Sequence, residues 1–179
     1  MNKQEIGKWF LIFLAFGCIG WIYEVAIMWF EMHDGFVNRG FLYGPCLPIY
    51  GIGGLIILFV AGRFRRHPLL CFLVICALTT GTELLASYLV EWWVKKPLWD
   101  YRDTGFGPTF EGRIALRSSV QFGLIGMAAV YLVYPVLNFL IGKLRKRFPT
   151  FYRVLWFTLA ALFLVDLAWH VIHGSNAQW

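Results

Sequence analysis

The chain has 179 residues, of which 59% are apolar, 19% aromatic and 15% charged, and its net charge is +6. Soluble domains carry about 45–50% apolar and about 25% charged residues, so this composition excludes an ordinary soluble domain. It also excludes an intrinsically disordered chain, because disorder requires low hydrophobicity.

Five apolar segments are long enough to cross a hydrocarbon core of about 30 Å as helices. They are Trp9–Phe30, Pro45–Gly62, Pro68–Val94, Ser118–Ile141 and Phe151–Ile172. The first is too long for a signal peptide and contains Glu24, so we interpret it as a retained anchor. We therefore expect a single transmembrane domain over residues 1–179. Its fold class is all-α, a polytopic bundle of about five transmembrane helices.

Basic residues predict the orientation of these spans. Ten of the sixteen basic residues lie in three places: at or before the start of the first span, between spans 2 and 3, and around the connection of spans 4 and 5. These are Lys3, Lys8, Arg63, Arg65, Arg66, Lys143, Arg145, Lys146, Arg147 and Arg153, opposed there only by Glu5. Because cytoplasmic loops are rich in Lys and Arg, we expect the N-terminus inside and the C-terminus outside. The same charges suit a lipid bilayer as partner, and we expect no nucleic-acid binding.

Three carboxylates lie inside spans that run outward, namely Glu24, Glu83 and Asp166. Each follows the start of its span by fifteen residues, which places it about 22 Å from the cytoplasmic edge. A charge at this depth costs at least about 2.5–3.5 kcal/mol, so it is by default a functional hypothesis.

Span 4 runs inward and begins with Arg113, Arg117 and Gln121 at positions i, i+4 and i+8, which share one helix face. Their depth matches that of the carboxylates. We therefore predict a polar cluster in the outer leaflet. In this cluster Arg117 pairs with Glu24 or Glu83, and Arg113 is a second candidate partner for the same carboxylates. A structural ion-pair network that only fixes helix register is the alternative.

Two outer segments are suited to recognition. The first, NRGFLYGPCLPIYGIGG (38–54), contains two prolines and several glycines, so it favours irregular backbone that brings the Tyr43 and Tyr50 hydroxyls into a cavity. The second, WDYRDTGFGPTFEGRIALRSS (99–119), suits a cap over the cluster.

The sequence contains no P-loop, no Gly-x-Ser-x-Gly motif and no His-Glu-x-x-His motif, and we expect no cofactor and no metal. Asp166, His170 and His173 are spaced so that one helix face could present them to a metal or haem. The two histidines could equally be approaching the outer interface, and the sequence leaves this choice open.

The strings NRGFLYGPCLPIYGIGG, WDYRD and EGRIALRSSVQFGLIG resemble the ABC-transporter type IV family, the CmpB-like permeases. The resemblance runs from GWIYE at residues 20–24 to the end of span 4 and does not clearly extend into span 5. It implies a bacterial multipass inner-membrane protein that acts as a permease-like component. Matching positions identify the candidate substrate-binding residues Glu24, Tyr43, Tyr50, Glu83, Trp99, Asp100, Tyr101, Arg113 and Arg117, to which the helix face adds Gln121.

We expect a transport component whose outer-leaflet cavity binds a small anionic or zwitterionic solute or a lipid headgroup. Five spans are few for one translocation path, so we expect a homodimer or a partner membrane or ATPase subunit. Gly51, Gly53 and Gly54 would support helix contacts.

Two alternatives to this transport function stay open. One is an intramembrane enzyme acting on a lipid or isoprenoid headgroup, with Glu24 or Glu83 as general acid or base. The other is a non-catalytic assembly or regulatory subunit, and overall we favour a protein that is not an enzyme.

Overall fold

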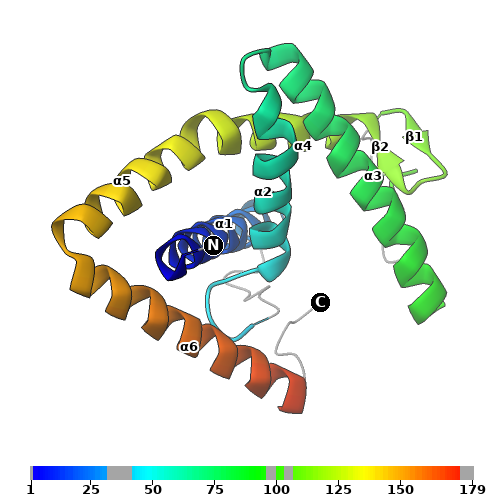
Figure 1. Cartoon of the computed structure of the whole chain (residues 1–179). Coiled ribbons are helices and arrows are strands. Elements are labelled where there is room, and N and C mark those ends of the chain that lie inside the picture. The colour runs from blue at the N-terminus through cyan, green and yellow to red at the C-terminus, as the bar shows by residue number, and fades with distance from the viewer. Residues whose placement is uncertain (1, 32–41, 96–99, 103–106, 174–179) are drawn as a thin grey trace. The chain divides into compact units, whose positions relative to one another are not determined.

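The computed structural model describes residues 2–31, 42–95, 100–102 and 107–173, and most of these are helical (Figure 1). The helices are α1 (Lys3–Glu31), α2 (Pro48–Val60), α3 (Pro68–Val94), α4 (Leu116–Ala128), α5 (Tyr134–Arg147) and α6 (Pro149–His173). A 3₁₀ turn, η1 (Ala61–Phe64), follows α2, and a π-helical turn, η2 (Ala129–Val133), lies between α4 and α5. Two short antiparallel strands, β1 (Thr109–Phe110) and β2 (Ile114–Ala115), precede α4. The predicted all-α fold with membrane-spanning helices is confirmed.

Among the described residues, four helices are long and apolar enough to cross a membrane: Lys3–Ile27, Pro68–Leu89, Leu116–Arg147 and Pro149–His173. The remaining predicted span is a shorter apolar helix, Pro48–Phe64. It is shorter because residues 42–47 are not helical, and the 13 residues of α2 extend only about 20 Å at 1.5 Å per residue. The number of spans and their orientation stay predictions.

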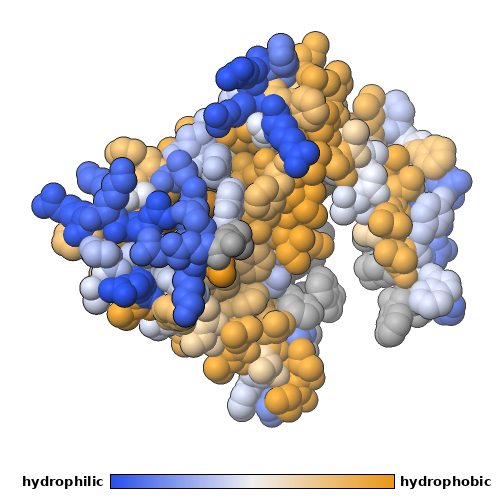
Figure 2. Space-filling model, in the orientation of Figure 1, coloured by the Kyte–Doolittle hydropathy of each residue, from blue (hydrophilic) through white to orange (hydrophobic). Residues whose placement is uncertain are grey.

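The apolar surface of these helices fits a lipid environment. Large apolar side chains are exposed along them, including Phe30 (77%), Val171 (75%) and Leu69 (72%). Figure 2 shows apolar side chains over large parts of the visible surface. Water covers the surface of a soluble protein, which rarely exposes this much apolar area. Exposed apolar area on this scale therefore marks a surface that contacts another apolar phase, such as lipid.

The chain divides into two compact units, and each is described by itself. Unit 1 comprises Met1–Leu55 and Pro135–Trp179, and unit 2 comprises Ile56–Tyr134. The expected single domain over residues 1–179 stays a prediction.

Glycines allow close helix packing in unit 1. A Cβ added to Gly20 of α1 would lie 2.2 Å from Cγ of Tyr50, and one added to Gly51 of α2 would lie 2.5 Å from the Phe13 ring. The first turns of α2 therefore rest directly on the backbone of α1. On another side of α1, the Phe13 and Phe163 rings meet edge to face at 5.4 Å, which joins α1 to α6.

Unit 2 has its own apolar core, built from the end of α2, η1, α3 and the turn η2. Its buried centre consists of Ala61, Cys71, Ile75 and Val130. A Cβ on Gly126 of α4 would lie 2.4 Å from Cγ2 of Ile75, so α4 also approaches α3 closely. The π-helical turn η2 ends at Val133, two residues before Pro135. A widened turn accommodates a proline, which has no N–H to donate and whose ring clashes with the preceding turn.

The glycine contacts generate a prediction with a matched control on the same helix. We expect Gly51→Ala to lower the thermal stability of the purified protein, because the new Cβ would lie 2.8 Å from the carbonyl oxygen of Phe13. Overpacking of this kind costs about 1–3 kcal/mol. A Cβ on Gly53 meets nothing within 4 Å, and Ala favours a helix over Gly by about 1 kcal/mol. Gly53→Ala should therefore be neutral or stabilising, and equal losses in both variants would contradict the packing.

Candidate functional site

The polar centre of unit 2 is built around Glu83 of α3. Its Oε1 accepts a hydrogen bond from the Tyr101 hydroxyl at 2.8 Å, and the Ser118 hydroxyl lies 3.5 Å from the same oxygen. Its Oε2 is buried and has no hydrogen-bond partner among the residues that the structure describes. Burial and the neighbouring carboxylate raise the pKa of Tyr101 to about 12. Tyr101 therefore keeps its proton and remains a donor at neutral pH. We call Glu83, Tyr101 and Ser118 the Glu83 centre.

Contacts between α3, α4 and the strand pair place these side chains. Ser118 lies in the first turn of α4 and is buried. The adjacent Ser119 accepts a hydrogen bond from the Thr80 hydroxyl of α3 at 2.7 Å, which holds the two helices side by side. The Tyr101 amide donates to the carbonyl oxygen of Gly112 at 2.8 Å, so the turn between the strands fixes the position of Tyr101.

A second polar group surrounds Arg113, which lies in the turn between β1 and β2. Its guanidinium donates to Glu91 of α3 and lies 3.5 Å from Oε2 of Glu111. It also lies 4.2 Å from the centroid of the Tyr88 ring, and the Tyr88 hydroxyl donates to Glu111 at 2.6 Å. The hydrogen bond to Glu91 raises the pKa of Arg113, so the guanidinium stays charged. We call Arg113, Glu91, Glu111 and Tyr88 the Arg113 network.

The turn between the strands depends on backbone conformations that helices do not use. Glu111 and Gly112 have φ values of 52° and 70°. A Cβ on Gly112 would lie 2.3 Å from Oδ1 of Asp100, so glycine is required there on two grounds. Asp100 in turn pairs with Arg102, whose guanidinium lowers the pKa of Asp100 to about 2. The turn and the segment 100–102 thus form one hydrogen-bonded cap.

The predicted arginine face is wrong in two respects. Helix α4 begins at Leu116, so Arg113 precedes it and cannot share a helix face with Arg117 and Gln121. The helical spacing was misleading because β2 (Ile114–Ala115), which is not helical, lies between Arg113 and Arg117. The described carboxylate partners of Arg113 are Glu91 and Glu111, where the sequence predicted Glu24 or Glu83. Arg117 and Gln121 lie on α4 with exposed side chains.

Three of the predicted site residues lie in unit 1. Glu24 accepts a hydrogen bond from the Tyr50 hydroxyl of α2. Tyr43 is exposed, and its amide donates to Oδ1 of Asp166 at 3.0 Å, while the amide of Gly44 donates to Oδ2 at 2.8 Å. Asp166 thereby attaches the non-helical segment 42–47 to α6.

The structure divides the predicted site residues between the two units. Six lie in unit 2: Glu83, Asp100, Tyr101, Arg113, Arg117 and Gln121. Trp99 lies outside the described residues. That Glu24 joins Glu83 in one cluster stays a prediction.

Metal binding finds no support in the part of the chain that the structure describes, where no group of three His, Cys, Asp or Glu side chains could hold an ion. Both oxygens of Asp166 accept backbone hydrogen bonds. His170 is buried, and His173 stacks on the Trp169 ring at 4.0 Å.

Sequence reasoning missed Ser118, Glu91 and Tyr88 as members of the site. The spacing of Glu83 and Glu91, eight residues apart, places both on one face of a helix and was a usable signal. Ser118 carried no comparable signal, because its proximity to Glu83 depends on the rotation of α4 about its axis.

Comparison with protein families identifies the chain. The family described as "Putative ABC-transporter type IV" matches residues 11–171. The chain belongs to this family. The match extends beyond span 4 and includes most of α6, so the expected end of the resemblance was too early. The bonds from the segment 42–47 to Asp166 give a physical reason, because α6 supports a segment within the NRGFLYGPCLPIYGIGG string. Neither a search of curated proteins nor one of solved structures found a match.

The Glu83 centre generates a prediction on stability. We expect Tyr101→Phe to reduce the free energy of unfolding by about 1–3 kcal/mol, because the buried carboxylate oxygen loses its donor. Tyr43→Phe is the matched control, since Tyr43 is exposed and its amide makes its described hydrogen bond. Its effect should stay within about 0.5 kcal/mol. Denaturation of both variants in one detergent measures the difference, and an unaffected Tyr101→Phe would contradict the hydrogen bond.

Proposed function

We propose that this member of the ABC-transporter type IV family is the membrane component of a transporter that binds a small zwitterionic solute through unit 2. The observation that supports it is the buried Oε2 of Glu83, which has no hydrogen-bond partner among the described residues. Leaving a buried acceptor unsatisfied costs about 1–3 kcal/mol. A solute ammonium group would supply the missing donor, and its charge would compensate the carboxylate.

Charge favours a zwitterion over a simple anion. The two polar groups of unit 2 contain the carboxylates of Glu83, Glu91 and Glu111 against the single guanidinium of Arg113. A purely anionic solute would be repelled, whereas a solute with a cationic end would be attracted. Glu83 and Glu91 are eight residues apart on α3, which corresponds to about 12 Å along the helix axis. An extended zwitterion would place its ammonium at the Glu83 centre and its acidic end toward the Arg113 network.

Within the Arg113 network, the guanidinium is the group that suits the acidic end of such a solute. Glu91 and the Tyr88 ring orient the guanidinium, and only 20% of the Arg113 side chain is exposed. A guanidinium held in one plane matches the planar, two-oxygen geometry of a carboxylate. A low local dielectric strengthens this interaction compared with the same contact in water.

We infer that the protein lies in a bacterial inner membrane with its N-terminus in the cytoplasm. The excess of basic residues before α1, between α2 and α3, and around the α5–α6 junction supports this orientation. It places Glu91, Glu111 and the cap at residues 100–102 toward the outside. Energy for transport would come from an ATPase subunit, because the sequence has no P-loop. A second copy of the chain would supply further helices for a translocation path.

Ligand-induced stabilisation tests the proposed binding. We expect at least one member of a panel of extended zwitterions, made up of long-chain ω-amino acids and short peptides, to raise the unfolding midpoint of the purified protein. Saturation at 100 times the Kd adds about 2.7 kcal/mol to the free energy of unfolding. Glu83→Gln should lose this response, whereas Glu5→Gln, which also removes one carboxylate but lies in unit 1, should retain it. An equal response in Glu83→Gln, or no response to the panel in the parent protein, would overturn the proposal.

Cysteine accessibility tests the orientation. In a background without the native cysteines, Arg66→Cys and Lys146→Cys should resist a membrane-impermeant maleimide in intact cells. Lys95→Cys and Glu111→Cys should react, because we place them outside. All four should react after the membrane is permeabilised, which controls for local burial. The reverse labelling pattern would show that the orientation is inverted.

A further inference from the structure

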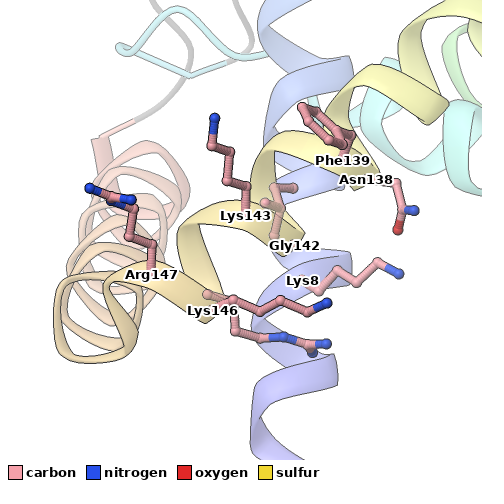
Figure 3. A pocket seen from close by; sticks show the side chains of 9 residues that line it. Lys8, Asn138, Phe139, Gly142, Lys143, Lys146 and Arg147 are labelled. Carbon is pink, nitrogen blue, oxygen red and sulfur yellow. The ribbon is translucent and has the colours of Figure 1, made fainter.

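Unit 1 contains a hollow that belongs to neither of the polar groups described above. It has a volume of about 670 Å³ and lies between α1 and α5 (Figure 3). Its lining consists of Lys8, Asn138, Phe139, Ile141, Gly142, Lys143, Arg145, Lys146 and Arg147. All of these residues belong to unit 1, so the hollow does not depend on the placement of unit 2.

The hollow is strongly cationic. Five of its nine lining residues are Lys or Arg, and none of the nine is acidic. Glu5 is the described carboxylate that pairs with one of them, Arg145, and this pair orients the guanidinium at the wall of the hollow. One carboxylate compensates only one of the five basic side chains. The net charge of the lining is therefore positive, and the hollow attracts anions.

Part of this charge gathers on one side of α5. Asn138, Gly142 and Arg145 are spaced at i, i+4 and i+7, so they share a helix face. In Figure 3, Lys8 of α1 and Lys146 of α5 extend to the same side as the Asn138 amide, whereas Lys143 and Arg147 extend away from it. Gly142 has no side chain, and a Cβ added there meets nothing within 4 Å, which leaves the space between these groups open.

The lining is amphipathic along the helix axis. Phe139 lies seven residues before Lys146 on α5, which is about 10 Å at 1.5 Å per residue. The Phe139 side chain is 65% exposed and offers an apolar surface next to the cationic end. An apolar surface beside a cationic hollow matches a molecule that carries a phosphate and a hydrocarbon chain.

We propose that this hollow binds the phosphate headgroup of an anionic phospholipid, with Lys8, Arg145 and Lys146 around the phosphate and the acyl chain along Phe139. Guanidinium and ammonium groups form strong, charge-assisted hydrogen bonds to phosphate oxygens. Basic pockets between helices on the cytoplasmic side are suited to such headgroups. The proposal is independent of the zwitterion site, because it uses other residues in the other unit.

Native mass spectrometry of the purified protein with phosphatidylglycerol tests this site. Each basic residue near anionic lipid contributes about 1 kcal/mol, so the double variant Lys8→Gln/Lys146→Gln should bind about thirtyfold more weakly. Arg63→Gln/Arg66→Gln is the matched control, because it removes two charges from the η1 region outside the hollow. It should retain most of the affinity. Equal weakening in both double variants would overturn the proposal in favour of diffuse surface attraction.

Steric filling of the hollow gives a test that leaves its charge unchanged. Gly142→Leu should abolish phosphatidylglycerol retention, whereas Gly142→Ala should preserve it, and circular dichroism checks that both variants stay helical. Undiminished retention in a folded Gly142→Leu would overturn the site. Phosphatidylcholine and inorganic phosphate serve as separate probes in the parent protein. Phosphatidylcholine retained as well as phosphatidylglycerol would overturn the requirement for an anionic headgroup. Displacement of phosphatidylglycerol by millimolar inorganic phosphate would overturn the lipid as occupant in favour of a free phosphate.

Discussion

A carboxylate inside an apolar helix must find hydrogen-bond donors from elsewhere in the chain, and this constraint organises the protein. Asp166 of α6 accepts the amides of Tyr43 and Gly44, Glu83 of α3 accepts the Tyr101 hydroxyl, and Glu24 of α1 accepts the Tyr50 hydroxyl. In each case the donor belongs to a non-helical segment or to another helix. The local sequence of a donor segment does not by itself fix where that segment packs against the helix that carries the carboxylate. These half-buried carboxylates attach those segments to the helices, and removing a donor leaves the acceptor unsatisfied at a cost in stability.

These carboxylates differ in how many of their oxygens accept hydrogen bonds. This difference helps to distinguish a carboxylate with a structural role from one that is a candidate for ligand binding. Asp166 uses both oxygens on backbone amides, so its role is complete within unit 1. Glu83 uses Oε1, while its buried Oε2 has no hydrogen-bond partner among the described residues. A network that only fixed helix register would gain by satisfying both oxygens, since an unsatisfied buried acceptor weakens the fold. The Glu83 centre is therefore the better candidate for ligand binding, and the sequence alone could not distinguish it from Asp166.

Much of the fold follows from composition, but the partners of the site residues do not. Runs of apolar residues predicted the long helices. Glu24, Glu83 and Asp166 within them each accept a hydrogen bond, whereas their common depth in the membrane stays a prediction. Helical spacing failed at Arg113, because the strand β2 lies between Arg113 and the start of α4 and the assumed periodicity does not hold there. Depth in the membrane also could not predict that Glu91 would be the partner of Arg113, since depth ignores the rotation of each helix about its axis. Long-range contacts such as those from the segment 42–47 to α6 lie beyond any local pattern.

The two candidate sites differ in charge for a reason that follows from the membrane itself. In the orientation that we propose, the basic residues accumulate on the cytoplasmic side. Five of them line the hollow between α1 and α5, and three of these, Lys8, Arg145 and Lys146, are the ones that we place around the phosphate. The site proposed in unit 2 has the opposite charge, because Arg113 is held there by Glu91 and Glu111 and Glu83 adds a third carboxylate. A site with three carboxylates and one guanidinium gains most from a ligand that has a cationic end and an acidic group for the guanidinium. A cationic hollow gains most from a phosphate. In the proposed orientation, the distribution of charge that sets the helices in the bilayer thus also favours a different ligand chemistry at each of the two proposed sites.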